Sequence, residues 1–72
     1  ESRANLDHSV QQLPDSLKAV FVLRDIEGLS TRETADVLDI SEAAVKTRLS
    51  RARFRLRELL TAYYSERMPS AV

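Results

Sequence analysis

The most regular hydrophobic pattern lies in the last third of the chain and predicts one long amphipathic helix. Apolar residues there recur at steps of three and four, which places them within about 60° of one line on a helix. This apolar stripe consists of Val45, Leu49, Ala52, Leu56, Leu59, Leu60 and Tyr63. We therefore expect a helix from Glu42 to Tyr63 whose apolar stripe is buried against the rest of the domain.

A short helix is predicted just before this long one. Ser30 and Glu33 have the spacing of a capping box, in which each side chain accepts a hydrogen bond from the backbone N–H of the other residue. The short helix should run from about Thr31 to Leu38. Ala35 within it is small, so a second helix can approach closely.

The two helices are separated by a tight turn. Asp39 lies in this turn, and Asp tolerates the left-handed conformation better than most residues do. Ile40 is apolar and can fill the corner, and Ser41 is a favoured cap for the long helix. The segment 30–57 therefore predicts a helix, a turn and a longer helix.

Two more helices are predicted upstream. Asn5 can cap a short helix, which Pro14 stops because the residue before a proline is pushed out of the α region. A second helix starts at Asp15 or Ser16 and runs to about Glu27. Gly28 ends it, because glycine readily adopts the left-handed conformation of a helix C-cap.

Composition agrees with an all-α fold and excludes several kinds of site. The 72 residues include no Cys and a single His, His8, which we expect to be solvated. Disulfides and cysteine-based metal sites are therefore excluded, and no nucleophile–base pair or glycine-rich phosphate loop is visible. We expect one small four-helix domain over residues 1–72, with its core at about 5–63 and a flexible tail at 64–72. We expect no cofactor, no metal and no enzymatic activity.

The ends and the apolar runs of the chain give two further expectations. The longest wholly apolar run, Ala19–Leu23, is far shorter than the ~20 residues that span a membrane. No signal peptide is visible. Because the chain starts at Glu1 rather than Met, we expect it to be a fragment of a longer protein.

The net charge of zero hides an uneven distribution of charge. Residues 1–40 hold four basic and eight acidic residues, whereas residues 41–72 hold seven basic and three acidic ones. Six of the basic residues lie between Lys46 and Arg57, a stretch without any acid. Charge gathered on one element is what nucleic-acid binding requires, and the acidic half should limit how the domain docks.

The long helix presents a basic face opposite its apolar stripe. Lys46, Thr47, Ser50 and Arg51 lie on or beside this face, and such side chains can bind base edges in the DNA major groove. A solvated basic face without a ligand is the alternative interpretation. The preceding short helix and tight turn favour DNA, because this layout is that of a helix-turn-helix.

The helix starts offer contacts to the DNA backbone. Free N–H groups at Ser30 and Ser41 are expected at helix N-termini, where phosphate binds favourably. Arg32 and Arg48 lie near these ends and are candidate phosphate contacts. Contacts of this kind would position the domain on DNA without reading its sequence.

Three segments of the chain carry a resemblance to a known family. They read LPxxL at residues 13–17, EGLSxxExAxxL at 27–38 and ISxxxVKTRLSRAR at 40–53. This pattern resembles region 4 of bacterial sigma factors and is most similar to the extracytoplasmic-function (ECF) group. The resemblance covers about residues 5–60, and its most specific part is the VKxRLxRAR stretch.

The resemblance implies a bacterial, cytoplasmic protein that binds the −35 promoter element and directs RNA polymerase to promoters. In that family the positions that face bases match Lys46, Thr47, Ser50 and Arg51. The positions that lie near the DNA backbone match Thr31, Arg32 and Arg48. The family also implies docking on the β-flap of RNA polymerase and occlusion by an anti-sigma factor.

Three features of the chain depart from the family pattern. Asp39 stands where the turn usually has Gly, and Ala43 and Ala44 replace a usual Gly-Thr pair. Thr34 replaces an aliphatic residue, which should weaken the packing of the short helix. None of these changes removes the basic face, but they bear on which promoter sequence is read.

Three apolar residues are candidate contacts for protein partners. Phe54 points away from the apolar stripe of the long helix. Apolar residues surround most of the second predicted helix, so that Val22 or Ile26 is left for a partner or covered by neighbouring helices. For Phe54, a contact with polymerase or an anti-sigma protein competes with an exposed aromatic that has no partner.

Two other functions compete with the sigma-factor interpretation. A LuxR-type response-regulator DNA-binding domain shares the GLSxxExAxxL segment, but the RAR continuation at residues 51–53 argues against it. The other alternative is a protein-interaction module whose basic helix docks on an acidic partner. Binding to DNA through several phosphates must weaken steeply with salt, which distinguishes it from such a module.

Overall fold

The computed structural model describes the backbone of residues 2–67 and the side chains of residues 6–62. This part of the chain forms four α-helices and one π-helical turn, and the all-α, four-helix prediction is confirmed. The elements are α1 Ser2–Gln11, α2 Asp15–Phe21, η1 Val22–Ile26, α3 Thr31–Leu38 and α4 Glu42–Arg67.

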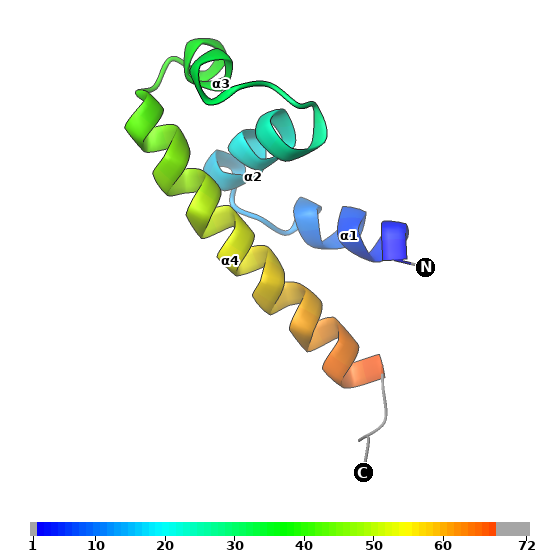
Figure 1. Ribbon diagram of the computed structural model, residues 1–72. Coiled ribbons are helices and arrows are strands. Elements are labelled where there is room, and N and C mark those ends of the chain that lie inside the picture. Colours follow the sequence, from blue (N-terminus) through cyan, green and yellow to red (C-terminus); the bar gives the residue numbers. More distant parts are fainter. Residues whose placement is uncertain (1, 68–72) are drawn as a thin grey trace.

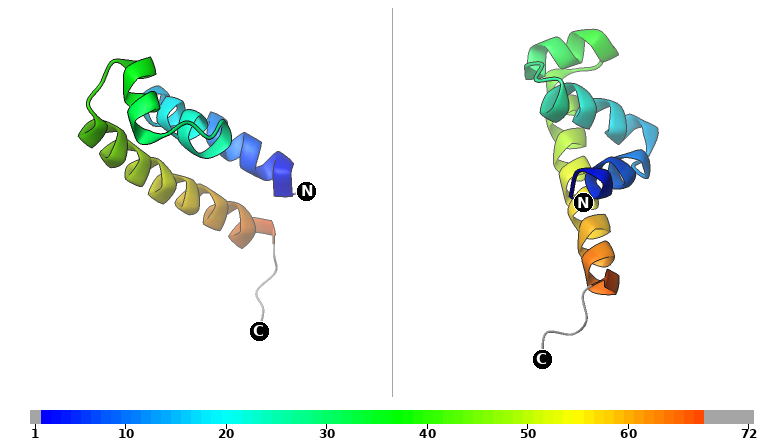
Figure 2. Two further views of the ribbon diagram at one scale, coloured as in Figure 1. Left: turned by 45° about the horizontal axis from the view of Figure 1, so that its top comes forward. Right: turned by 90° about the vertical axis from the view of Figure 1, so that its right-hand side faces the viewer.

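The long helix α4 is the axis of the fold (Figure 1). α3 lies near the start of α4, and α2 and α1 follow further along it. The two views of Figure 2 show that these three helices all lie on one side of α4. The opposite side of α4 is therefore left uncovered by the rest of the described chain.

The core lies where the other helices meet the apolar stripe of α4. Val45 and Ala52 are 0% exposed, Leu49 and Leu56 are buried, and Leu59 and Leu60 are half-buried. The other buried apolar residues come from the upstream helices and their connections: Val10, Leu13, Val20, Phe21 and Ala35. The predicted stripe is confirmed for all its members but Tyr63, whose side chain lies outside the described ones.

The structure moves two predicted helix boundaries. α1 begins at Ser2, so Asn5 lies inside this helix and does not cap it. The Arg and Ala between these two residues favour helix and extend α1 upstream. α4 continues to Arg67, beyond the predicted end at Tyr63, because neither Gly nor Pro interrupts residues 64–67. The rest of the tail expected to be flexible, residues 68–72, lies outside the described part.

The second predicted helix is α-helical over only part of its length. α2 starts at Asp15, as predicted, but the following turn η1 widens into a π-helix. In this turn the N–H of Glu27 donates to the carbonyl of Val22 at 2.8 Å. Gly28 follows with φ of +84°, which confirms its predicted role in ending the helix. Turns of this kind are often found at functional sites.

Candidate nucleic-acid interface

The predicted capping box closes the N-terminus of α3. The N–H of Glu33 donates to the Ser30 hydroxyl at 3.0 Å, and the N–H of Ser30 donates to the Glu33 carboxylate at 2.8 Å. The bond from the Ser30 N–H lowers the pKa of Glu33. It also occupies that donor, so the expectation of a free N–H at Ser30 is wrong. The next two N–H groups, of Thr31 and Arg32, have no helical acceptor and point out of the helix end.

The turn into α4 depends on a left-handed residue. Asp39 has φ 56° and ψ 49°, so it adopts the left-handed conformation that Asp tolerates better than most residues do. The N–H of Ile40 donates to the carbonyl of Ala35 at 3.1 Å, and Ile40 is half-buried against the core. The hydroxyl of Ser41 accepts from the N–H of Ala44 at 3.0 Å. The structure thus confirms the predicted turn, corner residue and cap.

The residues predicted to face bases lie on α4 outside its buried stripe. All four are exposed: Lys46, Thr47, Ser50 and Arg51. Lys46 and Ser50 line an open cleft of about 530 Å³ together with Thr31 of α3. The cleft thus joins the start of α3 to the first turns of α4, although contact with DNA bases stays a prediction.

Three of the predicted basic contacts do not line this cleft. Arg51 lines a second hollow, of about 480 Å³, with Leu17 of α2 and Phe54. Arg48 is half-buried, and Arg32 is exposed on the first turn of α3. The candidate residues therefore form a face that extends over both helix starts rather than a single pocket.

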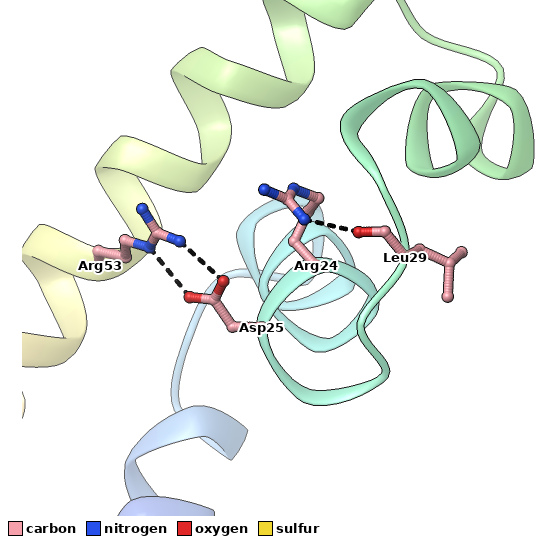
Figure 3. A network of polar contacts seen from close by, with 4 residues as sticks. All are labelled: Arg24, Asp25, Leu29 and Arg53. Atoms are coloured by element: carbon pink, nitrogen blue, oxygen red, sulfur yellow. Dashed lines mark hydrogen bonds and ion pairs between the residues drawn. The ribbon is translucent and has the colours of Figure 1, made fainter.

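Arg24 is a basic residue of the cleft that the sequence pattern did not single out. It extends from η1 and donates to the carbonyl of Leu29 at 2.6 Å (Figure 3). It lines the same cleft as Thr31 and Lys46, and its Nε is buried without a hydrogen-bond partner among the described residues. The one signal in the sequence is that no other basic residue occurs between Ala19 and Leu29.

Arg53 lies on the flank of the basic face, and an acid holds it there. Its Nε and Nη2 donate to the two carboxylate oxygens of Asp25 at 2.9 and 2.8 Å (Figure 3). The hydrogen bond from Arg53 lowers the pKa of Asp25, and the same bond raises the pKa of Arg53. One of the six basic residues between Lys46 and Arg57 is therefore paired with η1, a contact that no sequence pattern indicated.

The apolar candidates for protein contacts differ in how much surface they offer. Phe54 is 57% exposed and Ile26 is 53% exposed, whereas Val22 is half-buried against the core. Val37 on α3, which the sequence did not single out, is 62% exposed. A partner would therefore find more apolar surface at Phe54, Ile26 or Val37 than at Val22.

The described residues form neither a metal-binding cluster nor a helix that could span a membrane. His8 is exposed on α1, and its Nε2 lies 2.7 Å from the side-chain amide of Gln12. Within the part of the chain that the structure describes, no three His, Cys, Asp or Glu side chains lie together as a metal site would require. None of the described helices is both long and apolar enough to cross a membrane.

Comparisons with known proteins agree on one family. The family model for sigma-70, region 4 matches residues 3–56. The ECF RNA polymerase sigma factor SigE of Mycolicibacterium smegmatis is 38% identical over 68 residues, which cover 94% of this chain and 26% of that protein. The ECF RNA polymerase sigma factor SigW of Bacillus subtilis is 41% identical over 59 residues, which cover 76% of this chain and 32% of that protein. The chain thus spans about a quarter to a third of these relatives, and no solved structure matches it.

Proposed function

The chain belongs to the sigma-70 region 4 family, and we propose that it binds the −35 promoter element as the C-terminal domain of an ECF sigma factor. Its family and its relatives support promoter recognition and point to a transcription regulator rather than an enzyme. They also favour this function over that of a LuxR-type domain. One observation carries the proposal: α4 exposes Lys46, Thr47, Ser50 and Arg51 outside its buried stripe.

In the proposed complex, the first turns of α4 enter the major groove. Arg51 reads a guanine through its O6 and N7 atoms, because the guanidinium can donate two parallel hydrogen bonds. Lys46 donates to a base edge as a single point of charge, and Thr47 and Ser50 can bond with several edges. Ala43 is exposed one turn before Lys46, and its small side chain leaves room for the helix backbone to approach the bases.

We assign the contacts with the DNA backbone to residues at and near the starts of α3 and α4. The proposed contacts are Ser30, Thr31, Arg32, Ser41 and Arg48. Ser30 acts mainly by orienting the first turn of α3, since Glu33 already accepts from its N–H. Arg24 joins this set, because it lines the cleft that Thr31 and Lys46 also line. These contacts add affinity and register but no sequence preference.

Protein partners are proposed for the exposed apolar residues. The names of the relatives include RNA polymerase, which supports the polymerase as a partner of this chain. Docking on the polymerase β-flap and occlusion by an anti-sigma factor are what the resemblance to the family implies. Phe54 and Ile26 are the proposed contacts, with Val22 in a minor role. An interaction module that docks on an acidic partner is the second candidate function, because Phe54 shares a hollow with Arg51 and Arg55.

A salt titration on a selected duplex tests the proposal. The chain first enriches duplexes from a randomised library, and the enriched duplex is then compared with a scrambled one by fluorescence anisotropy. We expect tighter binding of the enriched duplex. We also expect the three arginines assigned to the backbone, Arg24, Arg32 and Arg48, to lower the affinity for both duplexes about 40-fold between about 50 and 200 mM salt. If no sequence is enriched, or if salt has no such effect, the proposal is wrong.

A further inference from the structure

We propose that η1 is a polar staple that holds α3 in place on α4, with Asp25 and Arg53 as positioning residues for promoter binding. The inference rests on the proposed function and concerns how the DNA-binding face keeps its shape. Two consecutive residues of η1 contact different neighbours: Arg24 the segment before α3, and Asp25 the helix α4 (Figure 3). One turn of chain therefore connects α3 and α4, which together form the proposed DNA-binding corner.

The first link of the staple is the ion pair between η1 and α4. Both carboxylate oxygens of Asp25 accept from Arg53, which is 28 residues away in the sequence. Two parallel hydrogen bonds fix an orientation as well as a distance, which a single-point contact cannot do. The Asp25 side chain is only 25% exposed, so the pair is partly shielded from water on the side of η1.

The second link connects η1 to the start of α3. Arg24 donates to the carbonyl of Leu29, and Leu29 directly precedes Ser30, the cap of α3. A displacement of η1 would therefore displace the first turn of α3. That turn carries Thr31, which faces the cleft together with Lys46.

α3 needs such links because its own apolar contacts are few. Of its eight residues, only Ala35 is a buried apolar one, and Ala offers little apolar surface. Leu38 is half-buried, and Thr34 is completely buried but its hydroxyl has no hydrogen-bond partner among the described residues. Packing alone thus leaves the position of α3 weakly determined compared with that of α2.

Two possible roles of the charged Asp25 side chain predict opposite effects of its removal on DNA binding. Its carboxylate lies close to Arg24, which is proposed to bind phosphate, so by its field alone it should repel DNA. If Asp25 acted only through that field, its removal would tighten binding to every duplex. If Asp25 positions the corner, its removal should weaken binding to the selected duplex although a negative charge is lost.

The experiment compares Asp25→Asn with Glu27→Gln in the chain, using the enriched duplex defined above. Glu27 is an exposed acid two residues away, and no side-chain contact of it is seen in the structure, so this control makes the same change of charge without breaking the pair. We expect Asp25→Asn to weaken binding about two- to fivefold, which is what an exposed charge pair typically contributes. Glu27→Gln should leave binding unchanged or tighten it slightly.

Two variants of Arg53 separate geometry from charge. Arg53→Lys keeps the charge but cannot form the two parallel bonds. We expect it to weaken binding as Asp25→Asn does, and we expect Arg53→Met to leave the salt slope unchanged. The Asp25→Asn/Arg53→Met double variant should bind no more weakly than the weaker of the two single variants, because both break the same link. Thermal melts of each variant identify any loss that comes from unfolding.

Three results would overturn the staple while leaving the proposed function intact. They are tighter binding by Asp25→Asn, wild-type affinity in Arg53→Lys, and a salt slope flattened by about 0.9 in Arg53→Met, which would make Arg53 a phosphate contact. A wild-type chain that enriches no duplex would instead overturn the proposed function, and the staple with it. The wild-type titration therefore distinguishes the two failures.

Discussion

α3 and α4 form the two halves of the proposed DNA-binding corner, yet different forces hold them in place. α4 has 26 residues and contributes four buried apolar side chains to the core, whereas α3 has eight residues and contributes one. α3 has a complete capping box, while the start of α4 has a single cap bond from Ser41. Packing therefore secures α4, and caps, turns and polar links secure α3.

The difference matters because a helix of eight residues is too short to be stable by itself. Such a helix keeps its place only while its ends and its neighbours hold it. Changes on the buried side of α4 should therefore act on the whole fold. Changes around α3 should cost less stability and act on the geometry of the cleft.

The largest effect is expected from the buried side of α4. Leu49→Ala should lower the free energy of unfolding by about 2–5 kcal/mol, because it removes apolar contacts and leaves a cavity. Urea unfolding measures the loss, and DNA binding should disappear with the fold. The control is the exposed neighbour Ser50, where Ser50→Ala should change stability by less than about 0.5 kcal/mol. Equal losses in both variants would contradict the division of α4 into a buried and an exposed side.

The next effect concerns the exposed side of α4. Arg51→Ala should cost about 1–3 kcal/mol of binding to the enriched duplex and relax the preference at one base pair. Arg48→Ala should weaken enriched and scrambled duplexes alike and flatten the salt slope by about 0.9. Anisotropy titrations at several salt concentrations measure both. If Arg51→Ala weakened binding to both duplexes equally, Arg51 would be a backbone contact. If Arg48→Ala left the salt slope unchanged, the proposed phosphate contact of Arg48 would be wrong.

The capping box of α3 should give a smaller loss of stability with its own pH dependence. Ser30→Ala should lower the free energy of unfolding by about 1 kcal/mol, the usual effect of removing an N-cap hydroxyl. The pKa of Glu33 is lower in the folded state than its ordinary 4.5, so its contribution is present above that value and is lost as the pH falls through the folded pKa. Glu33→Gln should therefore flatten the decline of stability below about pH 4.5, as measured by urea unfolding.

The same urea unfolding experiment would also show whether α3 depends only weakly on its cap, which would contradict this prediction. In that case Ser30→Ala would lower the free energy of unfolding no more than Ser50→Ala does, although Ser50→Ala removes an exposed hydroxyl that caps no helix. That outcome would remove the contrast between the two helices.

The smallest effect is a gain in stability at the α3–α4 contact. Thr34 is 0% exposed and its hydroxyl has no partner among the described residues. Thr34→Val keeps the shape and removes the unpaired polar group, so the free energy of unfolding should rise by roughly 0.5–1 kcal/mol. Thermal melts measure the gain, with Thr47→Val as the exposed control. A loss of stability would mean that the Thr34 hydroxyl is satisfied in solution.

Local patterns predicted much of the fold. The bounds of α3 were predicted correctly because the capping box at one end and Asp39 at the other are short-range signals. The buried stripe of α4 was predicted because its spacing depends only on the helical repeat. The π-helical turn was missed, since the sequence of η1 is compatible with an ordinary α-helix and only its contacts show the wider turn.

The candidate site was predicted in part. The base-facing candidates on α4 are exposed as expected, because they follow from the same helical repeat as the stripe. Arg24 and the pairing of Arg53 were not found. Both depend on which helices lie next to η1, and no local spacing encodes that.

By itself, the sequence determined the bounds of α3, the caps of α3 and α4 and the basic face of α4, because each depends on residues at most a few positions apart. Only the tertiary structure decided which basic residues line the cleft and which one is paired with an acid. Asp25 and Arg53 are 28 residues apart, and their bond exists because the core places η1 beside α4. The chain thus specifies its basic face locally, while long-range packing determines which charges of that face are available to DNA.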